Sequence, residues 1–308
     1  MRDRYVFPIV AVTLVVAPFV LRPVIAAEVL IFGMVAVANN VMLGYTGLLS
    51  FGQATFFGIG AYITGLLIIH WGGPLYIILP LVILASAALA VAIGYLCVQR
   101  IGLYFIMLTF AFNQMFYFIA YSWTRLTGGE DGLPGVSRPA YIRDDMNFYI
   151  FITAVFMLSL LLMKRVVDSP WGWLFQAVRD NPDRAAATGH NVRRVKLLSF
   201  VIAGAFTGFA GGLYAMVYGI VPVDAIHWLR SGDIVFMTLI GGSGNFFGPL
   251  LGAAFYVWLS ETLSLFWHRW PLLLGVVFAL VVLYLRGGIV EIIGRIAGRV
   301  TAPARPAE

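Results

Sequence analysis

The chain has 308 residues, of which 61% are hydrophobic and only 11% are charged. A soluble domain carries about 25% charged residues, and a compact soluble body of this size lacks the interior to bury so much apolar side chain. The composition therefore indicates a protein embedded in lipid. It excludes intrinsic disorder, which requires low hydrophobicity and many charges, and the single cysteine, Cys97, excludes a disulfide scaffold.

Ten segments are candidate membrane spans, because a hydrocarbon layer of about 30 Å is crossed by roughly 20 residues of α-helix. In chain order they cover residues 6–21, 24–43, 54–71, 75–98, 101–122, 148–163, 197–218, 231–242, 246–267 and 270–286. The eighth is short, and the sequence leaves open whether it spans fully or is a re-entrant or broken helix. The sequence predicts an all-α, polytopic bundle of about ten transmembrane helices.

The basic residues lie between these spans and predict the orientation, because Lys and Arg collect on the cytoplasmic side. Segment 164–196 has seven Lys or Arg against three Asp, whereas segment 123–147 has a net charge of −1. We expect 164–196 to be a cytoplasmic loop, 123–147 an outer loop, and both termini cytoplasmic. The net charge of +6 is thus a topology signal, and we expect no nucleic-acid partner.

The predicted membrane domain covers residues 1–290, and residues 291–308 form a cytoplasmic tail. The first span also resembles a signal peptide. The sequence leaves open whether it is cleaved, and we take residue 1 as the mature start.

Glycine is concentrated in two clusters that each enter a hydrophobic segment. One covers residues 44–62 and reads GYTGLLSFGQATFFGIGAY, and the other covers residues 241–256 and reads GGSGNFFGPLLGAAFY. Glycine-interrupted segments in two halves of a membrane protein are a pointer to internal repeats and to a transport path between them. The match is short, so repeat ancestry stays open.

Segment 164–196 contains the signals of two short helices. Ser169 can cap a helix that has Pro170 at its first position and runs to about residue 180, and Asn181 and Pro182 repeat this signal. The second helix continues through three alanines to Gly189, the residue type that most easily adopts the left-handed turn at a helix end. Two capped helices are more order than a simple connection between spans needs.

The chain shows no catalytic or metal-binding pattern. Neither of its two lysines, Lys164 and Lys196, follows a glycine-rich phosphate-binding loop, and the four histidines are scattered. We therefore expect no enzyme, no metal site and no cofactor in this chain. Glu28 and Glu261 fall toward the outer ends of spans, where each could line a path or lie at the interface.

Uncharged polar residues inside the spans are the candidates for a substrate path. Such groups either bond one another across helices or line a polar path, and the sequence leaves both readings open. They are Asn39, Asn40, Ser50, Gln53, Asn113 and Gln114.

Three motifs together identify a resemblance. They are GLLSFGQATFFGIGAY at 47–62, TGGEDGLPGV at 127–136 and AVRDNPDRAAATGHNVRRVKLLSFVIAGAFTGFAGGLYA at 177–215. With these motifs in this order, the chain resembles the branched-chain amino acid ABC importer permeases of the LivM type over residues 44–286.

The resemblance implies a permease subunit of a bacterial inner-membrane importer for leucine, isoleucine and valine. It implies as partners a second, homologous permease, two ATPase subunits that bind the ATP, and an extracytoplasmic substrate-binding protein. Relatives with similar motifs carry urea or short-chain amides, which is the first alternative, and a secondary amino-acid transporter is another. The coupling residues that the resemblance favours in the cytoplasmic loop are Arg179, Asp180, Asn181, Pro182, Arg184, Ala185, Ala186 and Gly189.

Overall fold

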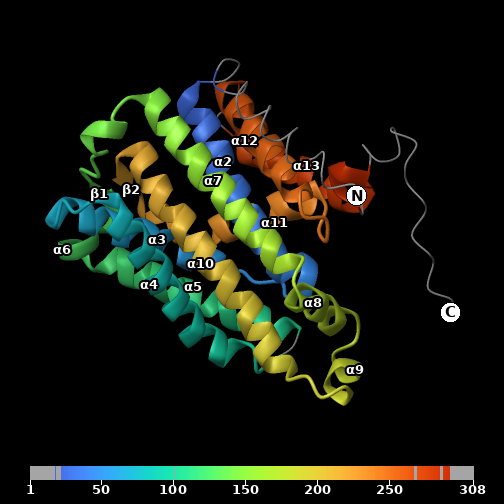
Figure 1. Cartoon of the computed structure of the whole chain (residues 1–308). Helices are drawn as coiled ribbons and strands as arrows, with labels where there is room; N and C mark the ends of the chain where they lie inside the picture. Colours follow the sequence, from blue (N-terminus) through green and yellow to red (C-terminus); the bar gives the residue numbers. More distant parts are fainter. Residues whose placement is uncertain (1–17, 19–21, 101, 267–268, 285–286, 292–308) are drawn as a thin grey trace.

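The computed structural model of the chain describes residues 18, 22–100, 102–266, 269–284 and 287–291. Most of these residues are in helices that form one bundle (Figure 1). Except for residue 18, the first expected span, 6–21, lies outside the described residues, as do residues 292–308 of the expected tail.

In the described part of the chain, six helices are long and apolar enough to cross a membrane. They are α2 (Pro23–Asn40) with its π-helical continuation η2 (Val41–Tyr45), α3 (Gln53–His70), α4 (Leu75–Cys97), α5 (Leu103–Ser122), α7 (Asp145–Val167) and α10 (Val192–Tyr218). These helices confirm an all-α, multi-pass membrane architecture.

The carboxyl-terminal helices are shorter or less apolar. They are α11 (Trp228–Gly241), α12 (Gly248–Phe266) and α13 (Trp270–Tyr284). The 14 residues of α11 extend about 21 Å at 1.5 Å per residue, which is less than the roughly 30 Å of a hydrocarbon layer. The eighth segment is therefore a short helix, as its length in the sequence indicated, and the total of ten spans stays a prediction.

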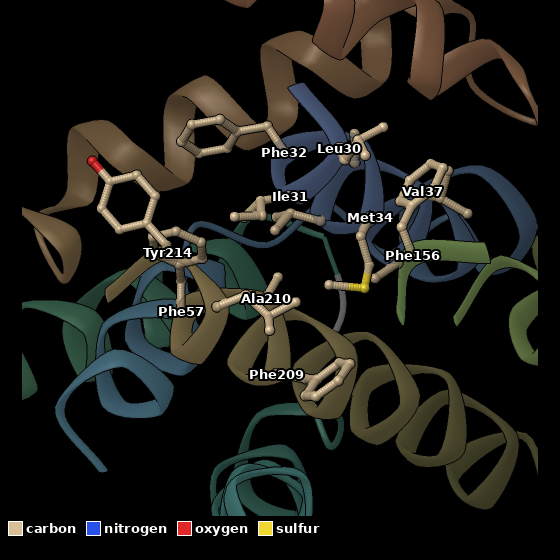
Figure 2. Close-up of a cluster of buried hydrophobic side chains, with 14 of the residues drawn as sticks. Leu30, Ile31, Phe32, Met34, Val37, Phe57, Phe156, Phe209, Ala210 and Tyr214 are labelled. Atoms are coloured by element: carbon tan, nitrogen blue, oxygen red, sulfur yellow. The ribbon is translucent and has the colours of Figure 1, made fainter. Parts of the chain in front are cut away.

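The core lies where α2, α3 and α10 pack together (Figure 2). The ring of Phe57 lies 5.9 Å from that of Phe32 and 5.2 Å from that of Tyr214, measured between centroids. Glycine allows the close approach of α3 to α10, because a Cβ on Gly60 would overlap the carbonyl oxygen of Gly208. Small residues have this packing role in membrane helices, where lipid provides no hydrophobic force between them.

One end of the bundle contains short elements from two segments. They are α6 (Thr124–Thr127), η3 (Gly129–Asp131), β1 (Leu133–Pro134), η4 (Ala140–Ile142), β2 (Ile220–Val221) and η5 (Val223–Ala225). Because β1 pairs with β2 in an antiparallel arrangement, segments 123–147 and 219–227 meet at what we call the β1–β2 end.

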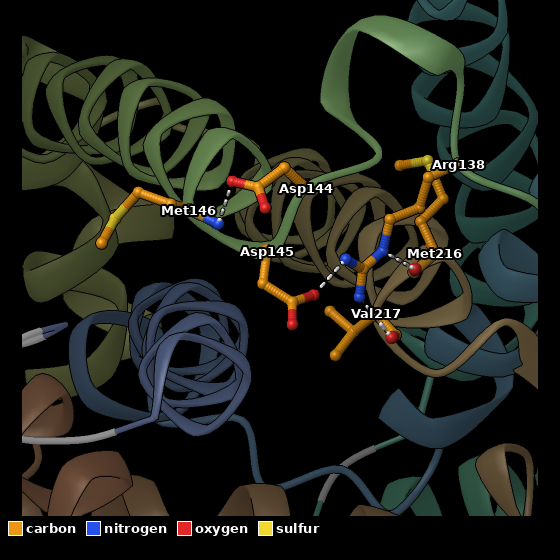
Figure 3. A network of polar contacts seen from close by, with 6 residues as sticks. All are labelled: Arg138, Asp144, Asp145, Met146, Met216 and Val217. Carbon is orange, nitrogen blue, oxygen red and sulfur yellow. Dashed lines mark hydrogen bonds and ion pairs between the residues drawn. The ribbon is translucent and has the colours of Figure 1, made fainter.

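Arg138 fastens this end to the bundle (Figure 3). Its Nε and Nη2 donate hydrogen bonds to the carbonyl oxygens of Met216 and Val217 at 2.9 and 2.8 Å, and Nη1 lies 2.6 Å from Oδ1 of Asp145. The last carbonyls of α10 lack partners within the helix, and a cation there also interacts favourably with the helix dipole.

At the opposite end two short helices, α8 (Pro170–Asp180) and α9 (Pro182–Ala187), connect α7 to α10 (Figure 1). We call this the α8–α9 end. Phe175 and Val178 of α8 are buried against the bundle, so α8 is packed against the body of the protein.

Candidate functional site

The predicted caps of α8 and α9 are confirmed. The side chain of Ser169 accepts a hydrogen bond from the backbone nitrogen of Trp171, and that of Asn181 accepts one from the backbone nitrogen of Arg184 at 2.8 Å. Gly189 has a φ of +87°, in the left-handed region that glycine occupies without strain. Local sequence signals therefore specify both helices and the turn that follows them.

Arg179, in the last turn of α8, links this segment to the first glycine cluster. Its Nη1 donates a hydrogen bond to the carbonyl oxygen of Gly44, in η2. Its aliphatic part covers Gly47, where a Cβ would lie 2.9 Å from Arg179 Cγ. A larger residue at 47 would displace the arginine, and would also be strained because Gly47 has a φ of +75°.

The second glycine cluster lies beside the first. The side-chain amide of Asn40 makes two hydrogen bonds to the backbone of adjacent residues. Its Nδ2 donates to the carbonyl oxygen of Asn245 at 2.8 Å, and its Oδ1 accepts from the nitrogen of Gly244 at 3.0 Å. A Cβ on Gly44 would lie 2.6 Å from the nitrogen of Gly244. The end of α2 and the loop between α11 and α12 are thus held together, about 200 residues apart in sequence.

Between η2 and α3 the chain leaves the helical conformation at residues 47–52 before α3 begins at Gln53. The new helix begins against α11, because the backbone nitrogen of Ala54 donates to Oγ of Ser231 at 2.9 Å. A helix break inside a membrane protein is tolerated where protein covers the freed backbone groups. Two helix amino termini, those of α3 and α11, therefore meet within the bundle.

Asn113 of α5 connects α3 with the segment that precedes α11. Its Nδ2 donates to Oγ1 of Thr55 at 2.9 Å and to the carbonyl oxygen of Ile226 at 2.8 Å. Its Oδ1 is buried and has no hydrogen-bond partner among the described residues. The Nδ2 of Asn113 therefore serves helix packing, whereas its Oδ1 has no such role among the described residues.

The other candidate path residues fall into two groups. Asn39 donates to Oγ1 of Thr238 at 2.9 Å and so joins α2 to α11, although its buried Oδ1 has no partner among the described residues. Ser50 accepts from the nitrogen of Gly52 at 3.1 Å, a local contact. Gln53 makes one long contact, 3.6 Å from Nε2 to Sδ of Met42. In the described part of the chain, the buried Oε1 atoms of Gln53 and Gln114 lack partners.

A groove lies on the surface of α8 and α9, with a volume of about 590 Å³. Its lining is mainly apolar, and two of its tryptophans, Trp171 and Trp173, are 49% and 70% exposed. The lining residues are Pro170, Trp171, Trp173, Leu174, Ala177, Ala185, Thr188 and His190.

The coupling residues of the resemblance are all at this end. Ala185 is buried and the other seven are exposed, so the segment has one face on the bundle and one face free. The sequence did not single out the two tryptophans as part of this surface.

Sequence reasoning also missed Arg230 and Asp233, in the first turns of α11. Arg230 Nη1 lies 3.6 Å from Asp233 Oδ2. The expected eighth span began at residue 231, so Arg230 fell outside it. Charged residues inside a helical membrane bundle are functional candidates, and the polar start of α11 was the signal that could have revealed them.

Among the described residues, no three His, Cys, Asp or Glu side chains are grouped so that they could hold a metal ion.

Comparison with known proteins shows the family to which the chain is similar. Residues 24–286 match the model of a family described as the permease component of branched-chain amino acid transport systems. The high-affinity branched-chain amino acid transport system permease protein LivM of Salmonella typhimurium is 27% identical, over 84% of this chain and 68% of the relative. The probable LivM permease of Methanocaldococcus jannaschii is 23% identical, over 80% of this chain and 83% of the relative.

Similarity extends to permeases with other names. The autoinducer 2 import system permease protein LsrC of Klebsiella pneumoniae is 28% identical over 59% of this chain and 54% of the relative. No solved structure matches the chain.

Proposed function

Because the chain belongs to the permease family of branched-chain amino acid transport systems, we propose that it is one membrane subunit of an ATP-driven importer for leucine, isoleucine and valine. The subunit moves substrate inward by alternating access, in a bacterial inner membrane. It works with a second, homologous permease, two ATPase subunits and an extracytoplasmic binding protein. The ATP is bound by the ATPase subunits.

The single observation that carries the proposal is the contact of Arg179 with Gly44 and Gly47. An ATP-driven permease whose ATP is bound by partner subunits must receive work through a contact with those subunits. A rigid, capped α8 that reaches the break between η2 and α3 offers a direct route for such work. A shift of α8 of one or two ångströms, typical of helix movements at subunit interfaces, would move this break.

We propose the groove on α8 and α9 as the docking surface for an ATPase subunit. An apolar groove with two exposed tryptophans is the kind of surface that a protein partner covers, because aromatic anchors dominate interface energetics. The exposed residues around it are those that the resemblance assigns to coupling: Arg179, Asp180, Asn181, Pro182, Arg184, Ala186 and Gly189.

Docking of the ATPase subunits at the α8–α9 end requires that end to be cytoplasmic. We propose that the β1–β2 end is outside, with about ten spans and both termini inside. The distribution of Lys and Arg supports this orientation. Reporter fusions after residues 135 and 185 test it, and we expect them on opposite sides of the membrane. Finding both on one side would reject the orientation.

Reconstitution of the whole transporter in proteoliposomes tests the function. We expect uptake of leucine, isoleucine and valine that requires ATP, the ATPase subunits and the loaded binding protein. Urea and acetamide, assayed in parallel, test the first alternative. Uptake driven by an ion gradient without ATPase subunits would establish a secondary transporter and reject the proposal.

A further inference from the structure

A charged cluster lies inside the bundle, apart from the α8–α9 surface. The guanidinium carbon of Arg230 lies 5.3 Å from the ring centroid of Phe32 and 6.0 Å from that of Tyr214. Phe32 is near the middle of the apolar 23-residue segment from Pro23 to Tyr45. Tyr214 is four residues before the end of α10. Arg230 therefore lies inside the helical bundle, in the half that contains the start of α2 and the end of α10, where a charge is costly and points to a functional role.

The pairing of Arg230 is incomplete. Its distance of 3.6 Å to Asp233 exceeds the 2.7–2.9 Å or so of a charge-assisted hydrogen bond. Its Nε is buried and has no hydrogen-bond partner among the described residues. Buried donors in native proteins are nearly always bonded, so this guanidinium has capacity for another acceptor. The side chains of Arg230 and Asp233 are 23% and 22% exposed, so neither is fully enclosed by the chain.

Two carboxylates and several aromatic groups surround the cation. Glu28 of α2 accepts a hydrogen bond from the hydroxyl of Tyr218 at 2.6 Å. The ring of Tyr218 lies 4.9 Å from that of Tyr214, which Arg230 overlies. Tyr256 of α12 interacts electrostatically with Asp233. Four helices, α2, α10, α11 and α12, thus contribute to one cluster. It contains one guanidinium, two carboxylates and the rings of Phe32 and Tyr214.

This chemistry matches an amino-acid zwitterion. A guanidinium binds a carboxylate through parallel hydrogen bonds, and an ammonium group is attracted by carboxylates and by aromatic faces. The amino terminus of α11 adds to the favourable field for an anion, an arrangement that transporters with interrupted helices use near the bilayer midplane. A neutral molecule such as urea carries no formal charge that could pair with the guanidinium or the carboxylates.

We propose that Arg230, Asp233 and Glu28 form a substrate-binding site inside this permease, which recognises the α-carboxylate and α-ammonium groups of an amino acid. Arg230 binds the carboxylate, and Glu28 and Asp233 hold the ammonium group. The proposal rests on the proposed function and narrows it. In addition to the binding protein, the permease itself selects substrates that carry both an α-carboxylate and an α-ammonium group.

The double variant Arg230→Gln/Asp233→Asn tests the site. It removes both members of the ion pair, which avoids the large cost of leaving one of these two charges buried without the other. The complete transporter in nanodiscs, without binding protein, is used to measure binding of radiolabelled leucine and its competition by leucinol, which lacks the carboxylate. We expect the native protein to prefer leucine to leucinol, and the variant to lose this preference and to bind leucine at least about 10-fold more weakly.

The control variant Arg125→Gln/Asp131→Asn removes the same two formal charges from exposed positions near the β1–β2 end. We expect it to bind like the native protein. An Arg230→Gln/Asp233→Asn transporter that assembles, binds leucine and discriminates against leucinol as the native one does would overturn the site. If that variant fails to assemble, Arg230→Lys decides, because it keeps the charge but loses the planar fork. Unchanged leucine binding by Arg230→Lys would also overturn the site.

The two proposals fail in different ways. If the native transporter shows no ATP-driven uptake of leucine, isoleucine or valine in proteoliposomes, the proposed function fails whatever the variants do. If native uptake is present and the variants retain both uptake and discrimination, only the binding site fails.

Discussion

Arg179 donates a hydrogen bond from Nη1 to the carbonyl oxygen of Gly44, 135 residues earlier in the chain. Its guanidinium also lies 3.5 Å from where a Cβ on Gly244 would be. One side chain of the α8–α9 end therefore lies against both glycine clusters, which Asn40 joins to each other. We therefore expect a movement of α8 to shift the segments that precede α3 and α12.

Replacing Arg179 is expected to uncouple ATP hydrolysis from transport. A hydrogen bond to a charged donor contributes about 1.5–3 kcal/mol, so Arg179→Gln should lower ATP-driven leucine uptake by about 10-fold or more while the ATPase subunits still bind and hydrolyse ATP. Uptake and hydrolysis measured on the same proteoliposomes check this. Arg100→Gln, an exposed change between α4 and α5, is the control. Equal uptake by both variants would contradict the coupling role.

Gly60→Ala is expected to destabilise the bundle. Its Cβ would overlap the carbonyl oxygen of Gly208, and overpacking against backbone costs about 1–3 kcal/mol or more. The midpoint of thermal unfolding in detergent should fall. Gly275→Ala in α13 is the matched control, because no described atom lies within 4 Å of its Cβ and alanine favours a helix over glycine by up to about 1 kcal/mol. A midpoint as high for Gly60→Ala as for Gly275→Ala would refute the close α3–α10 contact.

Asn40 and Gln53 are expected to respond differently to replacement by leucine. Asn40→Leu leaves the backbone groups of Gly244 and Asn245 without their partner, at a cost of about 1–3 kcal/mol for each group, so it should lower the thermal midpoint. Gln53→Leu loses only a 3.6 Å contact with a sulfur and should leave the midpoint nearly unchanged.

If Gln53 lines the path, Gln53→Leu should change the KM for uptake. An equal loss of stability in both variants would assign Gln53 to packing instead, and an unchanged KM would remove it from the path.

Position 189 is expected to accept asparagine better than valine. Gly189 has a φ of +87° and no described atom within 4 Å of a Cβ, so the cost of substitution is backbone strain and not collision. Asparagine adopts positive φ several times more often than other non-glycine residues, whereas a β-branched residue there is an outlier. Gly189→Val should reduce copurification of the ATPase subunits and ATP-driven uptake far more than Gly189→Asn.

The control for valine itself is Ala187→Val, which adds the same side chain at the exposed last residue of α9. If Gly189→Val and Ala187→Val are equally mild, the left-handed turn is not needed for docking.

The sequence by itself determined the features that depend on near neighbours. Hydropathy over about 20 residues located the long helices, and Ser169, Asn181 and Gly189 specified α8, α9 and the turn after them, because caps bond backbone groups two or three residues away. The motifs also placed the chain in its family.

Only the tertiary structure decided which distant residues meet. Asn40 is 205 residues from Asn245, and Ala54 is 177 residues from Ser231. Such pairs depend on how helices pack around the glycines of α3 and α10, and packing distances are not encoded in local spacing. The same is true of Arg230: its charge was visible in the sequence, but its position over Phe32 and Tyr214 and near Asp233 results from the packing of α11 against α2 and α10.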